Sequence, residues 1–193
     1  MELEPIRVLI EVTAALDRAG VEYAVGGSFA SAFHGLPRTT NDIDIAVFLP
    51  EPKVVGACAA LDAGFFVDEV AAREASRRRA SFNVFHRETM LKVDFFVLAG
   101  TPYDREQMRR RVRVVVGADP ATSAGMLAPE DVILRKLAWY RDGGGISERQ
   151  WLDVASVIKV QRERLDCGYL RTWAAELGVA ELLDRALVEA GAS

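Results

Sequence analysis

The hydrophobic pattern of this 193-residue chain changes its period close to Pro129. Upstream, short alternating or β-branched runs predict strands over residues 21–25, 43–49, 65–70, 81–86, 90–98 and 112–116. Downstream, apolar residues recur at helical spacing and predict helices over residues 129–141, 147–161, 167–177 and 179–190, with no convincing strand. We therefore expect a mixed α/β core over residues 1–120, followed by a helical region over residues 121–193.

Turn and cap residues agree with this division. Helices are also predicted in the first part, over residues 5–19, 28–34 and 53–63. Gly20 ends the first of these helices and Gly35 ends the second. At the change of period, Pro129 suits the first position of a helix, and the two acids that follow it suit the positive end of the helix dipole.

The composition argues against several classes of protein. Cys58 and Cys167 show no zinc spacing, and the chain has only two histidines. The N-terminus carries acids where a signal peptide carries basic residues, and no apolar run approaches the roughly 18 residues needed to cross a bilayer. We therefore expect a reduced, cytoplasmic protein with no membrane partner. The net charge of -4 argues against a coat on nucleic acid, although it allows a local basic patch for an RNA end.

Three aspartates indicate where chemistry takes place. Asp42 and Asp44 open a predicted strand and alternate with apolar residues, so they point to one face, about 7 Å apart. Asp94, on a later predicted strand, shares its face with Lys92. Neighbouring carboxylates repel, and divalent cations remove that cost by taking the oxygens as hard ligands. On neighbouring strands, the three acids would form a site for two metal ions.

A glycine turn predicts a site for an anion. Gly26-Gly27-Ser28 directly follows the predicted strand 21–25 and opens a short helix. This arrangement aims backbone N–H groups and a helix N-terminus at an anion, and the glycines let phosphate oxygens approach the backbone closely. Ser28 can cap the helix and contact a phosphate. Arg38, shortly before the acids, suits the neutralisation of a triphosphate.

Each of these features has a plainer interpretation when it is taken alone. Most Gly-Gly-Ser triplets are turns or helix caps, and a lone Asp-x-Asp is usually solvated surface. Lys92 and Asp94 also suit an ordinary charge pair. Their order along the chain favours function, because a strand, a glycine turn, a helix, two acids opening a strand and a third acid on an apolar strand rarely coincide.

Gly26-Gly27-Ser28 followed by Asp42-Ile43-Asp44 resembles the signature of the DNA polymerase beta-like nucleotidyltransferase superfamily. The resemblance covers residues 21–98. It implies a mixed β-sheet flanked by helices, Mg²⁺, a nucleoside triphosphate, and transfer of a nucleotidyl group to a hydroxyl.

The resemblance also implies roles for individual residues. Gly27 and Ser28 would hold the β- and γ-phosphates, with Gly26 opening the turn. Asp42 and Asp44 would bind two metal ions. Asp94 would bind the catalytic metal and help to deprotonate the acceptor.

The later helices narrow the resemblance. Leu134-Arg135-Lys136-Leu137-Ala138 and Arg149-Gln150-Trp151-Leu152-Asp153 resemble the last motif of the abortive-infection (AbiEii-like) nucleotidyltransferase toxins, and Lys92-Val93-Asp94 resembles their middle motif. This implies that Lys92, Lys136 and Asp153 complete the nucleotide site. The residues alone leave two alternatives open: a half-buried Lys136 that snorkels to solvent, and a plain i,i+4 ion pair between Arg149 and Asp153.

The acceptor has several candidates. The toxin resemblance favours RNA, in particular a tRNA end, with a cognate antitoxin as partner. The alternatives are an antitoxin-like enzyme that adenylylates a protein, an enzyme that modifies a small molecule such as an aminoglycoside, and a nucleotide-binding module without turnover. Two basic clusters, residues 77–79 and 109–113, suit RNA phosphates, but the acidity of the chain favours solvated faces.

Overall fold

The computed structural model of the protein describes residues 4–118 and 122–191, and its internal contacts divide the chain into two units. The first, here called the sheet unit, runs to Gly26 and then from Thr40 to Met126. The second, called the helical unit, consists of Gly27–Thr39 and the chain from Leu127 onward. The chain therefore leaves the sheet unit after Gly26 and returns to it at Thr40.

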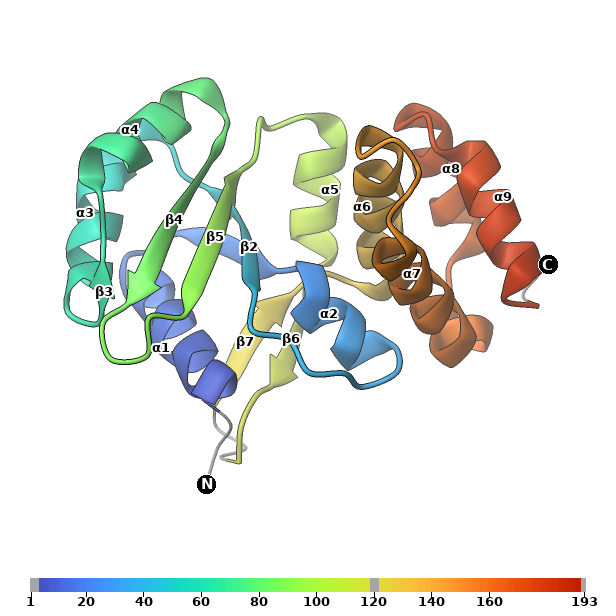
Figure 1. The fold of residues 1–193 in the computed structure, drawn as a ribbon. Helices are drawn as coiled ribbons and strands as arrows, with labels where there is room; N and C mark the ends of the chain where they lie inside the picture. The colour runs from blue at the N-terminus through green and yellow to red at the C-terminus, as the bar shows by residue number, and fades with distance from the viewer. Residues whose placement is uncertain (1–3, 119–121, 192–193) are drawn as a thin grey trace. The chain divides into compact units, whose positions relative to one another are not determined.

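Seven strands among the described residues form one mixed sheet, in the order β3-β4-β5-β2-β1-β7-β6 (Figure 1). They are β1 (Glu22–Val25), β2 (Ile43–Phe48), β3 (Phe65–Phe66), β4 (Ser81–His86), β5 (Lys92–Val97), β6 (Val112–Val115) and β7 (Ser123–Met126). The pairs β2–β5 and β1–β7 are parallel, and the other pairs are antiparallel. The mixed sheet with its helices confirms the predicted fold class.

The alternation predicted for the two central strands is confirmed. One face of β2 and β5 is apolar and at most 1% exposed; it carries Ile43, Ile45, Val93 and Phe95. Burying each of these side chains contributes about 1.5–3 kcal/mol. The helices α1 (Glu4–Arg18), α3 (Glu51–Asp62) and α4 (Glu69–Arg78) lie together along one side of the sheet, and α5 (Pro102–Arg110) contacts β1 (Figure 1).

Three elements of the sheet unit differ from the sequence prediction. The strand predicted over residues 65–70 ends at Phe66, because Asp68 caps α4 by accepting a hydrogen bond of 3.0 Å from the N–H of Ala71. The helix α5 was not predicted; it opens with a capping box between Thr101 and Asp104. The strand β7 was also missed, since Ser-Ala-Gly-Met has no β-branched residue and becomes a strand by pairing with β1 and β6.

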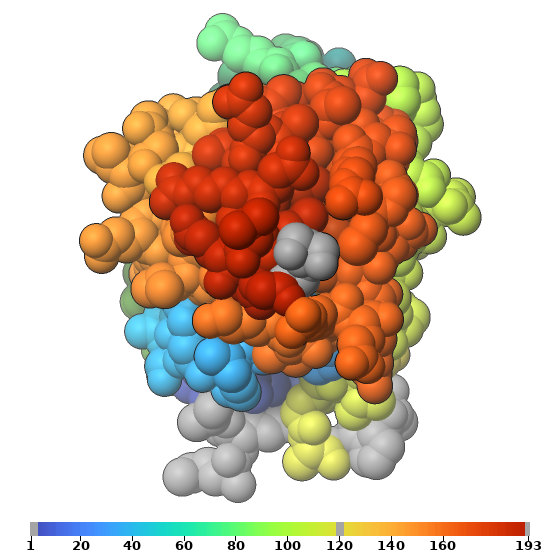
Figure 2. Space-filling model, turned by 90° about the vertical axis from the view of Figure 1, so that its right-hand side faces the viewer, coloured from blue at the N-terminus to red at the C-terminus, as the bar shows by residue number. Residues whose placement is uncertain are grey.

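The helical unit confirms the four helices predicted after Pro129. They are α6 (Pro129–Asp142), α7 (Glu148–Gln161), α8 (Cys167–Glu176) and α9 (Ala180–Glu189), with a short 3₁₀ turn at Arg162–Arg164. The earlier helix α2 (Gly27–His34) packs against α6 and α7. In Figure 2, α9 (red) lies at the surface of this unit beside α7 (orange).

The boundaries between the two units do not lie at residue 120, where the sequence predicted the change from the α/β core to the helical region. The helix α2 packs with the later helices, whereas β7 pairs within the sheet. Among the described helices, none combines the length and the hydropathy of a membrane span.

Candidate functional site

The carboxylates of the sheet unit lie in a row across neighbouring strands. Asp44 on β2 and Asp94 on β5 are direct partners in the parallel register, and Asn83 on β4 is the direct partner of Asp94. Side chains of directly paired residues share a face, with Cβ atoms about 4.5–5.5 Å apart. The register thus brings together two acids that are distant in sequence, and adds Asn83, an amide that the sequence prediction missed.

Asp42 lies just before β2 and is exposed to solvent. A local turn holds it, since its backbone N–H donates to Oγ1 of Thr40 at 3.3 Å. The glycine turn is tied to the same strand, because the N–H of Gly26 donates to the carbonyl of Asp44 at 2.8 Å. Within the sheet unit, Asp42, Asp44 and the start of the glycine turn therefore lie together at the beginning of β2.

Lys92 places a positive charge among these acids. Its Nζ lies 2.7 Å from Oδ2 of Asp94. The hydrogen bond to Asp94 raises the pKa of Lys92 despite some desolvation, and the charges of Asp94, Asp42 and Asp44 raise it further. The ordinary charge pair anticipated as an alternative therefore exists, within one strand. The charges of all three carboxylates favour a cation at this position.

The residue types of this face suit a divalent metal ion. Carboxylate oxygens are the hard ligands that Mg²⁺ prefers, and the Lys92 ammonium stands where the acids attract positive charge. In the described part of the chain, no three Asp, Glu, His or Cys side chains are gathered closely enough to hold a metal as they stand. The metal role of Asp42, Asp44 and Asp94 therefore stays a prediction.

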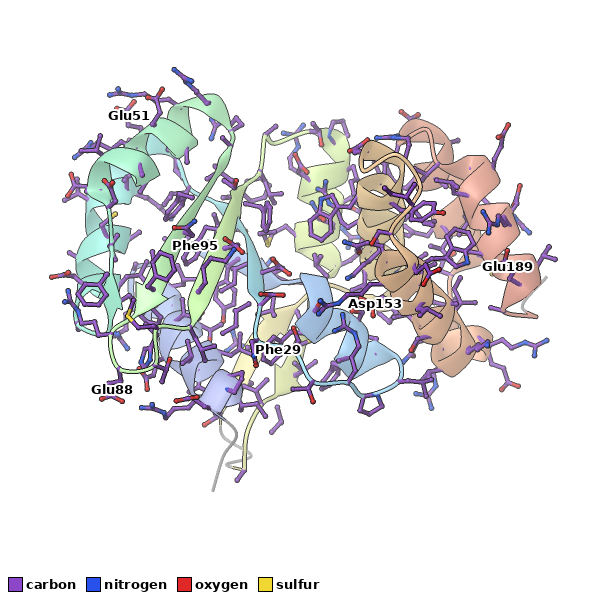
Figure 3. All side chains as sticks on the ribbon, viewed as in Figure 1. Phe29, Glu51, Glu88, Phe95, Asp153 and Glu189 are labelled. Atoms are coloured by element: carbon purple, nitrogen blue, oxygen red, sulfur yellow. The ribbon has the colours of Figure 1, made fainter. Side chains whose placement is uncertain are left out.

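The helical unit contains a second charged cluster, formed by Ser28, Arg38, Lys136 and Asp153. Arg38 donates from Nε and Nη2 to the two carboxylate oxygens of Asp153, each at 2.8 Å. Lys136 Nζ donates to Oδ2 of Asp153 at 2.6 Å. Arg38 Nη2 also donates to the Ser28 hydroxyl at 2.7 Å. Figure 3 labels Asp153 on α7, the helix that packs against α2.

Burial and charge both define this cluster. Lys136 and Asp153 are 3% and 5% exposed. Burial acts to raise the pKa of Asp153, but the hydrogen bonds and charges of Arg38 and Lys136 outweigh it, so this pKa is lowered. Two cations, Arg38 and Lys136, share the carboxylate of Asp153. A guanidinium and an ammonium beside a helix N-terminus suit an anion such as a phosphate.

Local backbone features position the cluster. Gly27 opens α2 with φ +54°, a left-handed conformation that favours glycine. At the other end of α2, the Leu36 N–H donates to the Ser156 hydroxyl of α7 at 2.5 Å. A Cβ on Gly35 would lie 2.4 Å from that oxygen, so only glycine fits. The segment that carries Arg38 is therefore fixed against α7.

The structure resolves both alternatives that the sequence left open here. Lys136 does not snorkel, because it is buried in a salt bridge with Asp153. The default pair of Arg149 with Asp153 is wrong as well, since the salt bridges of Asp153 go to Lys136 and Arg38. Four residues predicted to bind a nucleotide thus form one cluster, while their role in binding stays a prediction.

The mixed sheet with its flanking helices is a fold that this chain shares with solved structures of nucleotidyltransferases. No protein-family model matches the sequence, and no curated protein matches it either. An antigenic nucleotidyltransferase-like protein from Paracoccidioides brasiliensis aligns with a TM-score of 0.58 and 16% identity, over 97% of this chain and 91% of that one.

Two further solved structures share the fold. The antibiotic-resistance factor ANT(2'')-Ia aligns with a TM-score of 0.56 and 13% identity, over 97% of this chain and 96% of that one. The lincosamide antibiotic adenylyltransferase LnuA, solved with lincomycin, gives a TM-score of 0.51 and 12% identity, over 80% and 96%. At these identities the likeness establishes the fold, and the finer resemblance to AbiEii-like toxins stays a prediction.

Proposed function

We propose that the protein is a Mg²⁺-dependent nucleotidyltransferase that transfers a nucleoside monophosphate from a nucleoside triphosphate to a hydroxyl acceptor. The observation that carries the proposal is the direct register pairing of Asp44 with Asp94 on the sheet face. The two cations that bind Asp153 and the likeness to solved nucleotidyltransferases support it.

The proposal assigns the phosphates to the glycine turn and to the cluster around Asp153. The Ser28 hydroxyl, the backbone at Gly26 and Gly27, and the cations Arg38 and Lys136 would hold the β- and γ-phosphates. Asp153 would orient both cations. The chain passes from one group of residues to the other at Gly26–Gly27 and again at Thr39–Thr40.

The proposal assigns the chemistry to the sheet face. Asp42, Asp44 and Asp94 would hold two Mg²⁺ ions, which neutralise phosphate charge and acidify the acceptor hydroxyl. Asp94 would accept the proton of that hydroxyl. The hydroxyl oxygen forms a bond to the α-phosphorus, and the bond from that phosphorus to the bridging oxygen breaks, releasing pyrophosphate. Lys92 would exchange Asp94 for a phosphate oxygen once the nucleotide binds.

RNA, in particular a tRNA end, is the acceptor that we propose first, in a toxin held in check by a cognate antitoxin. Transfer to a small hydroxylated molecule is the second candidate, favoured by the likeness to the antibiotic-resistance factor ANT(2'')-Ia and to LnuA. An antitoxin-like enzyme with a protein acceptor is a third.

Labelled transfer tests the proposal and separates the acceptors. The protein is incubated with Mg²⁺, each α-labelled nucleoside triphosphate, and in turn total RNA, lysate protein and aminoglycosides. Label sensitive to RNase, sensitive to protease, or carried by the small molecule identifies the acceptor. We expect Asp42→Ala and Asp44→Ala to abolish transfer, whereas Asp62→Ala, which removes an exposed carboxylate on α3, preserves it.

Two results would refute the assignment. Full transfer by both Asp42→Ala and Asp44→Ala would exclude these carboxylates from the reacting centre. Tight binding of nucleoside triphosphate without transfer to any acceptor would instead identify a nucleotide-binding module.

A further inference from the structure

The surface of the helical unit exposes four large apolar side chains on two neighbouring elements. Leu152 and Val160 on α7 are 66% and 50% exposed, and Phe33 and Leu36, at and just beyond the end of α2, are 52% and 63% exposed. The two elements are in contact (Figure 1), and the N–H of Leu36 donates to the hydroxyl of Ser156, halfway between Leu152 and Val160 in the chain. Exposed apolar side chains gathered in this way are typical of a surface that binds another protein.

The exposed side of α7 follows a spacing that is symmetric about Ser156. Steps of three, four, four and three residues connect Arg149, Leu152, Ser156, Val160 and Glu163. Residues three or four apart are neighbours on a helix surface, so these five side chains form one stripe, here called the α7 stripe. Its last member lies in the 3₁₀ turn that directly continues α7. The same alternation of three and four residues lines the contact between paired helices, and a small residue at the middle lets two helices approach closely.

The charge of the α7 stripe reverses from one end to the other. It begins with Arg149 and ends with Glu163, and both residues are exposed. In the part of the chain that the structure describes, neither side chain forms an ion pair, and Lys159, one turn before Glu163, forms none either. Other exposed helical arginines differ, because they pair with a glutamate about one turn away: Arg78, Arg109 and Arg185. The two ends of the α7 stripe are therefore available to charged groups of another molecule.

We propose that the α7 stripe and the end of α2 bind a second copy of this chain in a two-fold dimer, in which the two α7 helices run antiparallel and cross at Ser156. Residues equally distant from Ser156 then face each other across the axis. Arg149 of one copy meets Glu163 of the partner subunit, and Leu152 meets Val160 of the partner subunit. Each contact occurs twice, as it does in any interface between two identical surfaces. One arrangement thus pairs the opposite charges and covers the apolar side chains.

Further residues of the same surface fit this two-fold arrangement. Glu148 and Arg164 are exposed, lie eight residues on either side of Ser156, and have no ion-pair partner among the described residues. Because their charges are opposite, they match across the axis as well. Leu36 is bonded to Ser156 through its backbone, so each copy adds an exposed leucine beside the crossing point. A partner of a single charge sign would be repelled at one end of the stripe, whereas a second copy matches both ends. The dimer is independent of the proposed function.

A charge swap tests the antiparallel arrangement. Arg149→Glu places like charges opposite each other at both ends of the interface, and so does Glu163→Arg. The double variant Arg149→Glu/Glu163→Arg restores opposite charges only across a two-fold axis, because the two positions lie about 21 Å apart along one helix. Arg171→Glu on α8 is the matched control, since Arg171 is an exposed helical arginine of the same unit with no ion pair in the described chain.

Sedimentation velocity of the full chain over a concentration series, without nucleotide or acceptor, measures the dissociation constant of the dimer. We expect a dimer for the wild type and an unchanged dissociation constant for Arg171→Glu. Each single swap should raise the dissociation constant about tenfold or more, and the double swap should return it to within about threefold of the wild type. Leu152→Asp should also weaken the dimer, because the interface would bury an unpaired carboxylate.

A wild type that stays monomeric over the whole series overturns the dimer and leaves the α7 stripe to a different protein. A dimer that neither single swap weakens, or that the double swap does not restore, excludes the antiparallel arrangement. Circular dichroism of each variant separates misfolding from dissociation, and all the substituted side chains are exposed, so the fold should be retained.

Discussion

Asp44 and Asp94 are direct neighbours in the parallel register of β2 and β5, so two carboxylates share one face of the sheet while the residues beside them fill the apolar core. Like charges at this spacing destabilise a fold unless a cation compensates them. The Lys92 ammonium provides part of that compensation. The pairing of the two carboxylates thus destabilises the fold and at the same time allows it to bind cations.

The first prediction concerns the carboxylate row. Asp44→Asn and Asp94→Asn keep the shape of the side chain and remove its charge. We expect each to reduce nucleotidyl transfer about 10³-fold, since several kcal/mol of transition-state stabilisation would be lost. Thermal unfolding without Mg²⁺ provides the control, because it measures what the charge of Asp44 contributes to the stability of the fold, and a small change would assign the lost transfer to the chemistry. A large loss of melting temperature would instead mark Asp44 as structural.

The second prediction concerns Lys92. Lys92→Met removes the cation that the acids hold, so Mn²⁺ or Mg²⁺ should bind the nucleotide-free protein several-fold more tightly. The same variant should bind nucleoside triphosphate more weakly if Lys92 binds a phosphate of the nucleotide. Calorimetry measures both affinities. Unchanged affinity for the metal would contradict the view that the ammonium occupies a cation site.

The third prediction concerns the buried pair of Lys136 with Asp153. Asp153→Asn leaves a buried ammonium without its carboxylate, and we expect it to lower the free energy of unfolding by about 3–5 kcal/mol. Lys136→Met/Asp153→Leu removes both charges and should be closer to the wild type in stability. Denaturant unfolding checks the order of the two variants.

Nucleotide binding then separates structure from function in this pair. The double variant should lose affinity for nucleoside triphosphate although it folds, because the Lys136 ammonium is gone and Arg38 no longer has the carboxylate that orients it. Wild-type affinity in a folded double variant would remove Lys136 and Asp153 from the proposed site.

The fourth prediction concerns pH. Burial lowers the pKa of His34, although its hydrogen bond to the Leu127 carbonyl and the charge of Glu130 act in the opposite direction. The unfolded chain therefore binds this proton first, so the helical unit should lose stability as the pH falls below about 6.5. His34→Gln can still donate to Leu127 and does not titrate. Its melting temperature should change less than that of the wild type between pH 7.5 and 5.

The fifth prediction concerns the glycine turn. At Gly27, with φ +54°, alanine should cost about 1–2 kcal/mol of stability and weaken the binding of nucleoside triphosphate. Gly56 lies within α3 with open space around it, so Gly56→Ala should raise stability by up to about 1 kcal/mol. If Gly27→Ala lowers the stability and Gly56→Ala raises it, the loss at position 27 is due to the backbone conformation of Gly27.

Much of the fold follows from local patterns. Alternation around Asp44 predicts a strand with one apolar face, and Pro129 marks the start of a helical region, because both signals lie within a few residues. The two wrong predictions have different causes, one local and one tertiary. Asp68 starts a helix where an apolar run suggested strand, and β7 depends on its neighbours for pairing.

The sequence by itself determined the residue types of the candidate site, the glycine at position 27, and the alternation of buried apolar residues along β2. Only the tertiary structure decided that Asp94 pairs with Asp44, and that Arg38 and Lys136, rather than Arg149, bind Asp153. Turns and strand faces follow from interactions between residues close in the chain. Strand register and buried ion pairs depend on which distant segments pack together, which local patterns do not specify.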